Sequence, residues 1–216
     1  MASKYRSKKL IVEGNQDKRV VPELMEANGI PWGESANDAV VYIEDYGSDG
    51  FIDADFISTE LKASGLIALG LLVDADDDLS ARWKSIRNAC LRSIPDIPED
   101  LPESGLIHAL DSGIKFGVWI MPDNKTQGML ETFLTYLIPT ASEPLWEYAQ
   151  EVSQEASKKG APYIEAHYDK ACIYAWLAWQ APPGRQLHNA ITEKILEPTR
   201  IEAQNFVSWF KKLYDL

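Results

Sequence analysis

Short apolar runs alternate with helix-spaced apolar positions along the first part of the chain. The runs lie at 9–12, 39–44 and 67–73. After each run, apolar side chains recur at the spacing of one helix face, over about 16–26, over about 54–63 and from Leu79 onward. Because strands that alternate with helices form parallel sheets through right-handed crossovers, the pattern predicts such a sheet with helices packed on it.

Two further apolar runs, at 105–110 and 115–121, flank the turn residues Asp111-Ser112-Gly113. A turn that contains glycine between two such runs predicts a β-hairpin. Apolar positions then predict a helix from about Gly128 to Leu137.

Beyond Pro139 the apolar spacing is helical, and Ala181-Pro182-Pro183-Gly184 interrupts it. We therefore predict an α/β sandwich, with a mostly parallel central sheet and helices on both faces over 1–138. A C-terminal helical extension over 139–216 is expected to pack on it. We also expect three tryptophans of this region in the core, because they fall at helical spacing on apolar faces: Trp176, Trp179 and Trp209.

The composition is that of an ordinary globular protein, with 45% hydrophobic and 25% charged residues. No apolar run is long enough to cross a bilayer, and residues 1–9 lack a signal-peptide pattern. The two cysteines, Cys90 and Cys172, lie in apolar helical patterns, which argues against a disulfide framework. We therefore expect a cytoplasmic protein without a membrane partner.

The formal net charge of −12 disfavours a protein that grips nucleic acid through a basic face. It leaves open a contact in which a metal ion bridges the protein to phosphate, because a bound cation can be the largest local charge in a site. Nucleic acid, or the phosphate of a nucleotide, therefore remains a candidate partner.

Carboxylates gather where two of the apolar runs end. Glu13 follows the first run, and Asp17 lies one helical turn later. Asp74 and Asp76 leave the third run, and Glu131 falls in the first turn of the helix expected after the hairpin. Ligands of open α/β sheets bind beyond the carboxyl ends of the strands, so we expect these side chains at one functional edge.

Carboxylate oxygens suit Mg²⁺ (or Mn²⁺), which also takes water and substrate phosphate as ligands. Neighbouring strands lie about 5 Å apart, so Glu13 can share one ion with Asp74 and Asp76 if their strands adjoin. The alternative is that the acidic residues serve as helix N-caps or first-turn acids, which accept hydrogen bonds from free amides and suit the helix dipole. This alternative fits Asp77 and Asp78 best, and it also applies to Asp17 and Glu131.

The pattern Val-Glu13-Gly-x-x-Asp17, with Val-Asp74-Ala-Asp76 two strands later, resembles the Toprim domain of topoisomerases, primases and related nucleases. The added Gly128-x-x-Glu131 resembles the third acidic motif of Toprim nucleases in the overcoming-lysogenization-defect group. Strings such as Gly-Val-Trp-Ile-Met-Pro-Asp-Asn and Gly-Met-Leu-Glu are similar to an uncharacterised Toprim-related family. The Toprim resemblance covers about residues 8–135, and the similarity to the uncharacterised family also includes the helical tail.

The resemblance implies a Toprim-like sandwich and Mg²⁺-dependent cleavage or transfer at a phosphodiester, most plausibly by a nuclease. It implies that Asp74 and Asp76 bind the metal. Glu13 would act as general acid/base or as a ligand of a second ion, and Asp17 and Glu131 would complete the second site.

A cation beside the carboxylates could neutralise the charge that develops on a reacting phosphate. Lys125 lies beside the expected pocket and is a candidate for this catalytic role, the alternative being a solvated loop residue. Arg82, Lys84 and Arg87, from the helix that begins near Leu79, are further candidates.

The nucleases of the overcoming-lysogenization-defect group carry an ATPase domain ahead of the Toprim domain, whereas only a dozen residues precede Glu13 here. No Gly-x-x-x-x-Gly-Lys-[Ser/Thr] loop occurs either, so an ATPase partner is expected on a separate chain. Two other functions remain open. One is a catalytically silent Toprim-like module that binds a nucleotide or a partner protein through the acidic pocket, and the other is phosphatase-type chemistry on a small phosphorylated metabolite.

Overall fold

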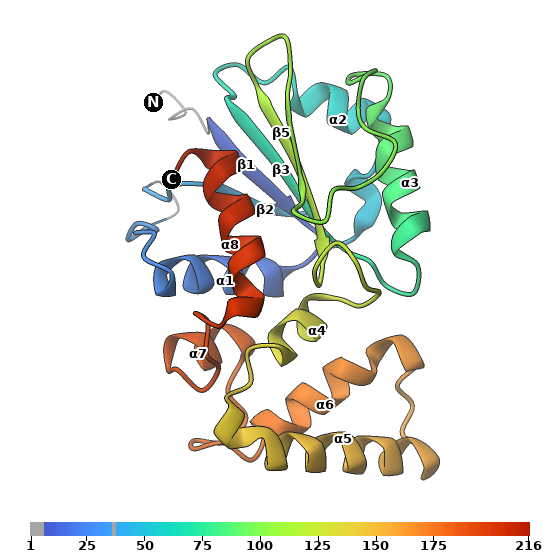
Figure 1. The fold of residues 1–216 in the computed structure, drawn as a ribbon, viewed down its shortest axis with the longest axis vertical. Helices are drawn as coiled ribbons and strands as arrows, with labels where there is room; N and C mark the ends of the chain where they lie inside the picture. The colour runs from blue at the N-terminus through green and yellow to red at the C-terminus, as the bar shows by residue number, and fades with distance from the viewer. Residues whose placement is uncertain (1–6, 36–37) are drawn as a thin grey trace.

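The computed structural model describes residues 7–35 and 38–216 and contains a five-stranded sheet between helices (Figure 1). Residues 1–6, on which part of the signal-peptide prediction rests, lie outside the described residues. The strands follow the order β2-β1-β3-β5-β4, and β4 is the one that runs antiparallel to its described neighbour. The predicted fold class, a mostly parallel α/β sheet with C-terminal helices, is confirmed.

The elements alternate as predicted. The strands are β1 (Lys8–Val12), β2 (Tyr42–Asp45), β3 (Ala68–Asp74), β4 (Leu106–Ala109) and β5 (Lys115–Met121). The helices that connect them are α1 (Asn15–Ala27), α2 (Ala54–Glu60) and α3 (Leu79–Cys90), and α4 (Leu130–Thr135) follows β5. The later helices are α5 (Glu143–Lys158), α6 (Tyr168–Leu177), α7 (Leu187–Thr192) and α8 (Ile201–Tyr214).

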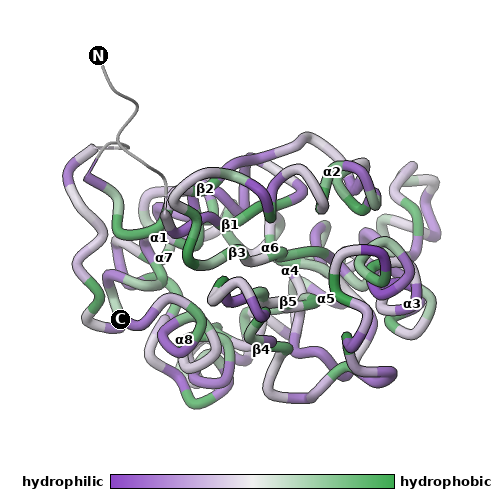
Figure 2. The backbone as a smooth tube through the Cα atoms, turned by 90° about the horizontal axis from the view of Figure 1, so that it is seen from above, coloured by the Kyte–Doolittle hydropathy of each residue, from purple (hydrophilic) through white to green (hydrophobic). Residues whose placement is uncertain are grey.

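Helices cover both faces of the sheet, which explains why the central strands are apolar along their length. Leu10 and Val12 of β1 join one apolar cluster, and Ile11 between them joins the other. The first cluster contains side chains of α1 and α8, and the second contains side chains of α2 and α3. Figure 2 shows the sheet, seen from above, between these two pairs of helices.

The last helix, α8, forms one layer of the sandwich. Tyr214 Oη donates a hydrogen bond to Lys9 O at 2.8 Å, and Trp209 Nε1 donates to Leu106 O at 2.9 Å. Gly70 of β3 permits this close approach, since a Cβ there would overlap the Tyr214 hydroxyl. The C-terminal helix therefore shares the core of the predicted α/β part of the chain.

One strand begins later than predicted. The strand expected over 39–44 starts at Tyr42 and continues to Asp45. The amide of Val40 donates to Trp32 O at 3.0 Å, so the first part of this apolar run pairs with a neighbouring loop instead of with the sheet.

Two helices are shorter than predicted. The helix expected over 54–63 ends at Glu60, and the helix expected from Gly128 to Leu137 spans Leu130–Thr135. In both cases the backbone hydrogen bonds after the helix join residues three apart instead of four. This tighter turn ends the regular α-helix.

The expectation for the tryptophans is correct for two of the three. Trp176 and Trp209 are buried in the first apolar cluster. Trp179 is 42% exposed, because it lies beyond the end of α6, where its ring packs against Tyr148 with 5.5 Å between the ring centroids. The prediction for Trp179 is therefore wrong.

Helices α5 and α6 pack on each other beyond the carboxyl edge of the sheet, and α4 lies between them and the strands (Figure 1). Ile173, Trp176 and Leu177 of α6 belong to the same apolar cluster as β1 and α4. The helical segment is thus fixed over the edge at which the acidic residues were expected. Over the part of the chain that the structure describes, no helix is both long and apolar enough to cross a membrane.

Candidate metal centre

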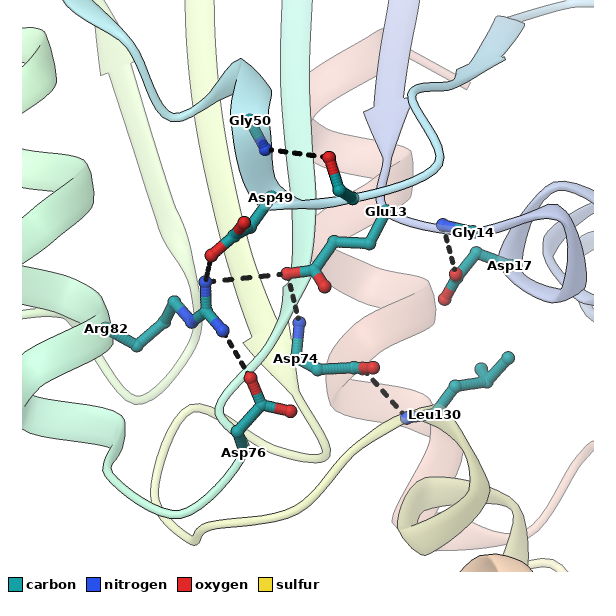
Figure 3. A network of polar contacts seen from close by, with 10 residues as sticks. Glu13, Gly14, Asp17, Asp49, Gly50, Asp74, Asp76, Arg82 and Leu130 are labelled. Carbon is teal, nitrogen blue, oxygen red and sulfur yellow. Dashed lines mark hydrogen bonds and ion pairs between the residues drawn. The ribbon is translucent and has the colours of Figure 1, made fainter. Parts of the chain in front are cut away.

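The site is built at the carboxyl ends of β1 and β3, which are neighbours in the sheet. Val12 pairs with Leu72, so the residues that follow them come to the same edge. Glu13 Oε1 accepts a hydrogen bond from the backbone amide of Asp74 at 3.2 Å (Figure 3). The condition under which Glu13 and Asp74 could share an ion, that their strands adjoin, is met.

Asp17 is held in the first turn of α1. Gly14 is the N-cap of this helix, and its amide donates to Asp17 Oδ2 at 3.1 Å. Asp17 is only 7% exposed, although a carboxylate at a helix start is usually in water. The residue therefore acts as a first-turn acid, as the alternative predicted, and also lies buried among the other carboxylates.

Helix α4 brings Glu131 to the same place. Asp74 Oδ1 accepts a hydrogen bond from the amide of Leu130 at 2.9 Å, which joins the end of β3 to the start of α4. The backbones of Asp76 and Gly128 exchange two hydrogen bonds of 2.9 Å and fix the loop before α4. Glu131 is consequently 3% exposed, and its side chain faces the pocket.

A pocket of about 300 Å³ lies where these elements meet. Four carboxylate side chains and one ammonium line it: Glu13, Asp17, Asp74, Glu131 and Lys170. The carboxylates come from the ends of two strands and the starts of two helices, and the ammonium comes from α6. The structure thus brings together four of the five predicted metal ligands.

Asp76, the fifth predicted ligand, lies beside this pocket and does not line it. Its backbone has a φ of 52°, in the left-handed region that asparagine and aspartate tolerate better than most residues. Its carboxylate hydrogen-bonds the guanidinium of Arg82, which also contacts Glu13 (Figure 3). Asp76 is thus connected to Glu13 through Arg82.

Two cations of the protein balance this acidic cluster. Lys170 Nζ lies 2.9 Å from Glu131 Oε1 on one side, and Arg82 contacts Glu13 and Asp76 on the other. Arg82 was among the cations suggested by the sequence. Lys170 was not, because it lies in a helical segment far along the chain and no motif marks it.

The other predicted cations lie elsewhere. Lys125 is exposed, and its Nζ pairs with Glu103 at 2.7 Å, outside the lining of the pocket. Lys84 is exposed on α3, and Arg87 Nε donates to Pro98 O at 3.0 Å. Asp49, which the sequence reasoning missed, hydrogen-bonds Arg82 at 2.8 Å from the turn after β2.

Burial raises the pKa of three of these carboxyl groups. It is the main reason why the pKa of Asp17 is raised to about 7, and the charges of Glu131 and Glu13 add to it. Burial, followed by the charge of Asp17 and the other carboxylates, raises the pKa of Asp74 well above its usual value. Burial also raises the pKa of Glu13, although the charge of Arg82 opposes the shift. Ionisation of these carboxyl groups therefore lowers the stability of the folded chain.

The donor set fits a hard divalent cation in its chemistry, because it consists of carboxylate oxygens. Within residues 7–35 and 38–216, however, no three His, Cys, Asp or Glu side chains lie so that they could hold a metal ion together. Arg82 pairs with Glu13 and Asp76, and Lys170 pairs with Glu131. A metal ion would therefore require these side chains to move.

The fold and the pocket define an α/β protein with a carboxylate-lined pocket beyond the ends of its parallel strands. The chain belongs to the family described as "Protein of unknown function (DUF3226)", whose model matches residues 7–215. No curated protein gives a significant match to the chain.

The chain is similar to solved structures of one kind of protein. The C-terminal region of the OLD protein from Xanthomonas campestris pv. campestris, phased with mercury, shares 15% identity at a TM-score of 0.47, over 99% of this chain and 98% of that one. The same region phased with platinum shares 14% identity at a TM-score of 0.48, over 97% and 94%. The C-terminal region of the Burkholderia pseudomallei OLD protein shares 15% identity at a TM-score of 0.47, over 97% and 99%.

Proposed function

We propose that the protein is a Mg²⁺-dependent enzyme of Toprim type that acts on phosphodiester bonds, and that it is a nuclease. The observation that carries the proposal is the convergence of Glu13, Asp17, Asp74 and Glu131 on one pocket at the carboxyl edge of the sheet. The order and spacing of the acidic motifs, which resemble those of Toprim nucleases, support the same function.

The electrostatics of the pocket favour a cation. Four carboxylates meet there, and the raised pKa of Asp17 and of Asp74 reflects both their burial and their mutual repulsion. Buried carboxylates with perturbed pKa values are characteristic of functional sites. A divalent cation would offset the part of this repulsion that Arg82 and Lys170 do not neutralise.

The residues take the following roles in this proposal. Asp74 and Asp76 bind one ion, and Asp17 and Glu131 complete a second site. Glu13 lies between the two halves and acts as general acid/base or as a shared ligand. Bound ions of this kind would supply an activated water and would stabilise the leaving oxygen. The carboxylates hold and orient them.

Lys170, rather than Lys125, is the cation that we assign to the reacting phosphate. It lines the pocket, whereas Lys125 pairs with Glu103 outside it. We expect Lys170→Met to lower the cleavage rate about 10²–10³-fold, the usual effect of removing one donor that stabilises transition-state charge. Metal affinity should not fall, because the variant removes a competing positive charge. Single-turnover cleavage assays and Mn²⁺ titrations of the same samples measure both quantities.

Two further variants make this assignment testable. Lys159→Met serves as the matched control, because Lys159 pairs only with Glu155 among the described residues and lies at the end of α5; its activity should equal that of the native chain. Lys125→Met provides the direct comparison. A loss of rate in Lys125→Met but not in Lys170→Met would contradict the assignment.

Calorimetric titration with Mg²⁺ and Mn²⁺ tests the proposed function itself. The native chain should bind, and the double variant Asp74→Asn/Asp76→Asn should not, because both neutral amides are weak ligands for hard cations. The titration should be repeated with an oligonucleotide present, since substrate phosphate often completes a magnesium shell. Single-stranded, duplex and nicked substrates are then screened with and without EDTA.

The principal alternative is a catalytically silent module that binds a nucleotide or a partner protein. The ion pairs of Arg82 and Lys170 favour it, because they already neutralise part of the pocket. Such a module would bind its ligand in EDTA and would show no cleavage with either metal. Absence of metal binding, both with and without oligonucleotide, would rule out the proposed nuclease.

A further inference from the structure

Arg82 is the most heavily engaged cation beside the pocket. Its Nη1 donates to Asp49 Oδ2 at 2.8 Å and lies 3.8 Å from Glu13 Oε1, and its Nη2 donates to Asp76 (Figure 3). The side chain is only 13% exposed. A partly buried guanidinium with three carboxylate partners, drawn from three different segments of the chain, is a specific structural arrangement and differs from an ordinary surface ion pair.

The guanidinium lies in the space between Glu13 and Asp76, two carboxylates that we assign to metal binding. Mg²⁺ binds carboxylate oxygens at about 2.0–2.1 Å and requires nearly octahedral geometry. An ion that joined Glu13 and Asp76 would therefore need the position that the guanidinium now fills. The positive charges of the ion and of Arg82 would also repel each other there.

We propose that Arg82 is an internal counter-ion of this site, and that a divalent cation displaces its guanidinium from Glu13 and Asp76 when it binds. The inference rests on the proposed function. Asp49 explains how Arg82 is held in place without metal, because it lies outside the pocket lining and anchors the guanidinium from the turn after β2.

The charge state of Arg82 agrees with this role. Burial lowers its pKa, but the hydrogen bond to Asp49 and the charges of Glu13 and Asp76 raise the pKa by more, so that it lies above its usual value. Arg82 therefore stays positive and competes with a metal ion at every working pH. Competition of this kind lowers the apparent metal affinity and stabilises the metal-free protein.

The test is the affinity for Mn²⁺, measured by electron paramagnetic resonance from the signal of the free ion. Arg82→Gln keeps a polar side chain but shortens it and removes its charge, and it should bind Mn²⁺ about tenfold more tightly or better, which corresponds to about 1.4 kcal/mol. Lys18→Gln is the matched control. Lys18 pairs with Asp45 at the end of β2, so this variant removes one positive charge at the same edge of the sheet without touching the carboxylates of the site.

Thermal melts of the same proteins give a second readout that does not depend on activity. In EDTA, Arg82→Gln should melt at a lower temperature than the native chain, because three carboxylates lose their counter-ion. Saturating Mn²⁺ should raise its melting temperature by more than it raises that of the native chain. Arg82→Lys keeps the charge but loses the planar fork, so its Mn²⁺ affinity should lie between those of the native chain and Arg82→Gln.

The outcomes separate this inference from the proposed function. Equal gains in affinity for Arg82→Gln and Lys18→Gln would show that Arg82 acts only as a distant charge, and would overturn the inference while the proposed function stands. An unchanged affinity in Arg82→Gln and Arg82→Lys would overturn it as well. If neither the native chain nor the Arg82 variants bind Mn²⁺, with or without an oligonucleotide, the proposed function fails together with the inference.

Discussion

Asp74→Asn is expected to give a protein that is more stable than the native chain and almost inactive. The pKa of Asp74 is raised by burial and by the charge of Asp17, so ionisation of this carboxyl group lowers the stability of the folded chain as the pH rises above about 4. Asparagine removes this cost and keeps an oxygen that can accept the hydrogen bond from Leu130. The variant should therefore melt several degrees higher at pH 8 in EDTA.

The same substitution should remove most of the activity. Loss of a carboxylate that holds a catalytic ion weakens stabilisation of the transition state by several kcal/mol, which corresponds to a rate lower by about 10³-fold. Single-turnover cleavage at saturating Mg²⁺ measures the loss, and differential scanning calorimetry measures the stability. A stable and inactive variant distinguishes a functional carboxylate from a structural one.

Asp77→Asn is the control for this experiment. Asp77 is exposed and lies in the same acidic run, so both its melting temperature and its cleavage rate should equal those of the native chain. Full activity in Asp74→Asn would contradict the nuclease proposal. If the native chain and both variants bind an oligonucleotide and none of the three cleaves it, the result would support the silent module instead.

The second large effect is the pH dependence of stability, to which Asp17 contributes together with Asp74. Its pKa is about 7 in the folded chain and 3.8 in the unfolded reference. At pH values between these two, the folded state retains a proton that the unfolded state has lost, so stability is fully present below about pH 4 and decreases until about pH 7. One pH unit between the two pKa values is worth about 1.4 kcal/mol, so the decrease reaches about 4 kcal/mol at most.

Asp17→Asn should remove the contribution of Asp17 to this decrease, while that of Asp74 remains. Asparagine cannot ionise, and its side-chain oxygen can still accept the hydrogen bond from the amide of Gly14. In EDTA, the melting temperature of the native chain should fall between pH 5 and pH 8 relative to the variant, by on the order of 10 °C. Melts at four pH values over this range, for both proteins, measure the difference.

Mg²⁺ should reverse the effect of rising pH on the melting temperature of the native chain relative to Asp17→Asn. A bound cation favours the ionised carboxylates, so the native chain should gain stability from the metal as the pH rises, whereas Asp17→Asn should gain less. Parallel pH curves for the two proteins in EDTA would contradict the raised pKa of Asp17 in the folded chain.

Much of the site could be predicted because it follows from the sheet. The apolar runs at 9–12 and 67–73 indicated buried parallel strands, and a carboxylate at the end of such a strand must lie at the carboxyl edge. The strand order could not be predicted from the runs alone. Strands β1 and β3 are neighbours in the folded sheet, and this pairing brings Glu13 to the amide of Asp74.

The cations of the site were harder to predict, because their positions depend on tertiary contacts. Lys170 reaches Glu131 because α6 packs against α4. The local sequence of either helix does not predict that contact. Lys125 is adjacent to the acidic motif in the sequence, yet its side chain turns to Glu103 in the loop before β4. Proximity along the chain was a poor guide to proximity in the pocket.

The strand expected over 39–44 shows the same limit on a smaller scale. Ala39 and Val40 are apolar and pack against the first apolar cluster, so the apolar run is real. Hydrophobicity indicates burial and does not specify the backbone partner, and the amide of Val40 donates to Trp32 O instead of to a strand. The sequence therefore indicates the core better than it indicates the ends of the strands.

The place of α8 in the sandwich has a consequence for biosynthesis. The face of the sheet that Phe206, Phe210 and Tyr214 cover is formed by strands that leave the ribosome much earlier. Until residues 201–214 have been translated, the part of that face beneath α8 stays open to water, and the nascent chain presents an apolar surface of the kind that molecular chaperones bind. Ribosome-bound chains halted before α8 should therefore recruit a ribosome-associated chaperone more strongly than chains halted well beyond it.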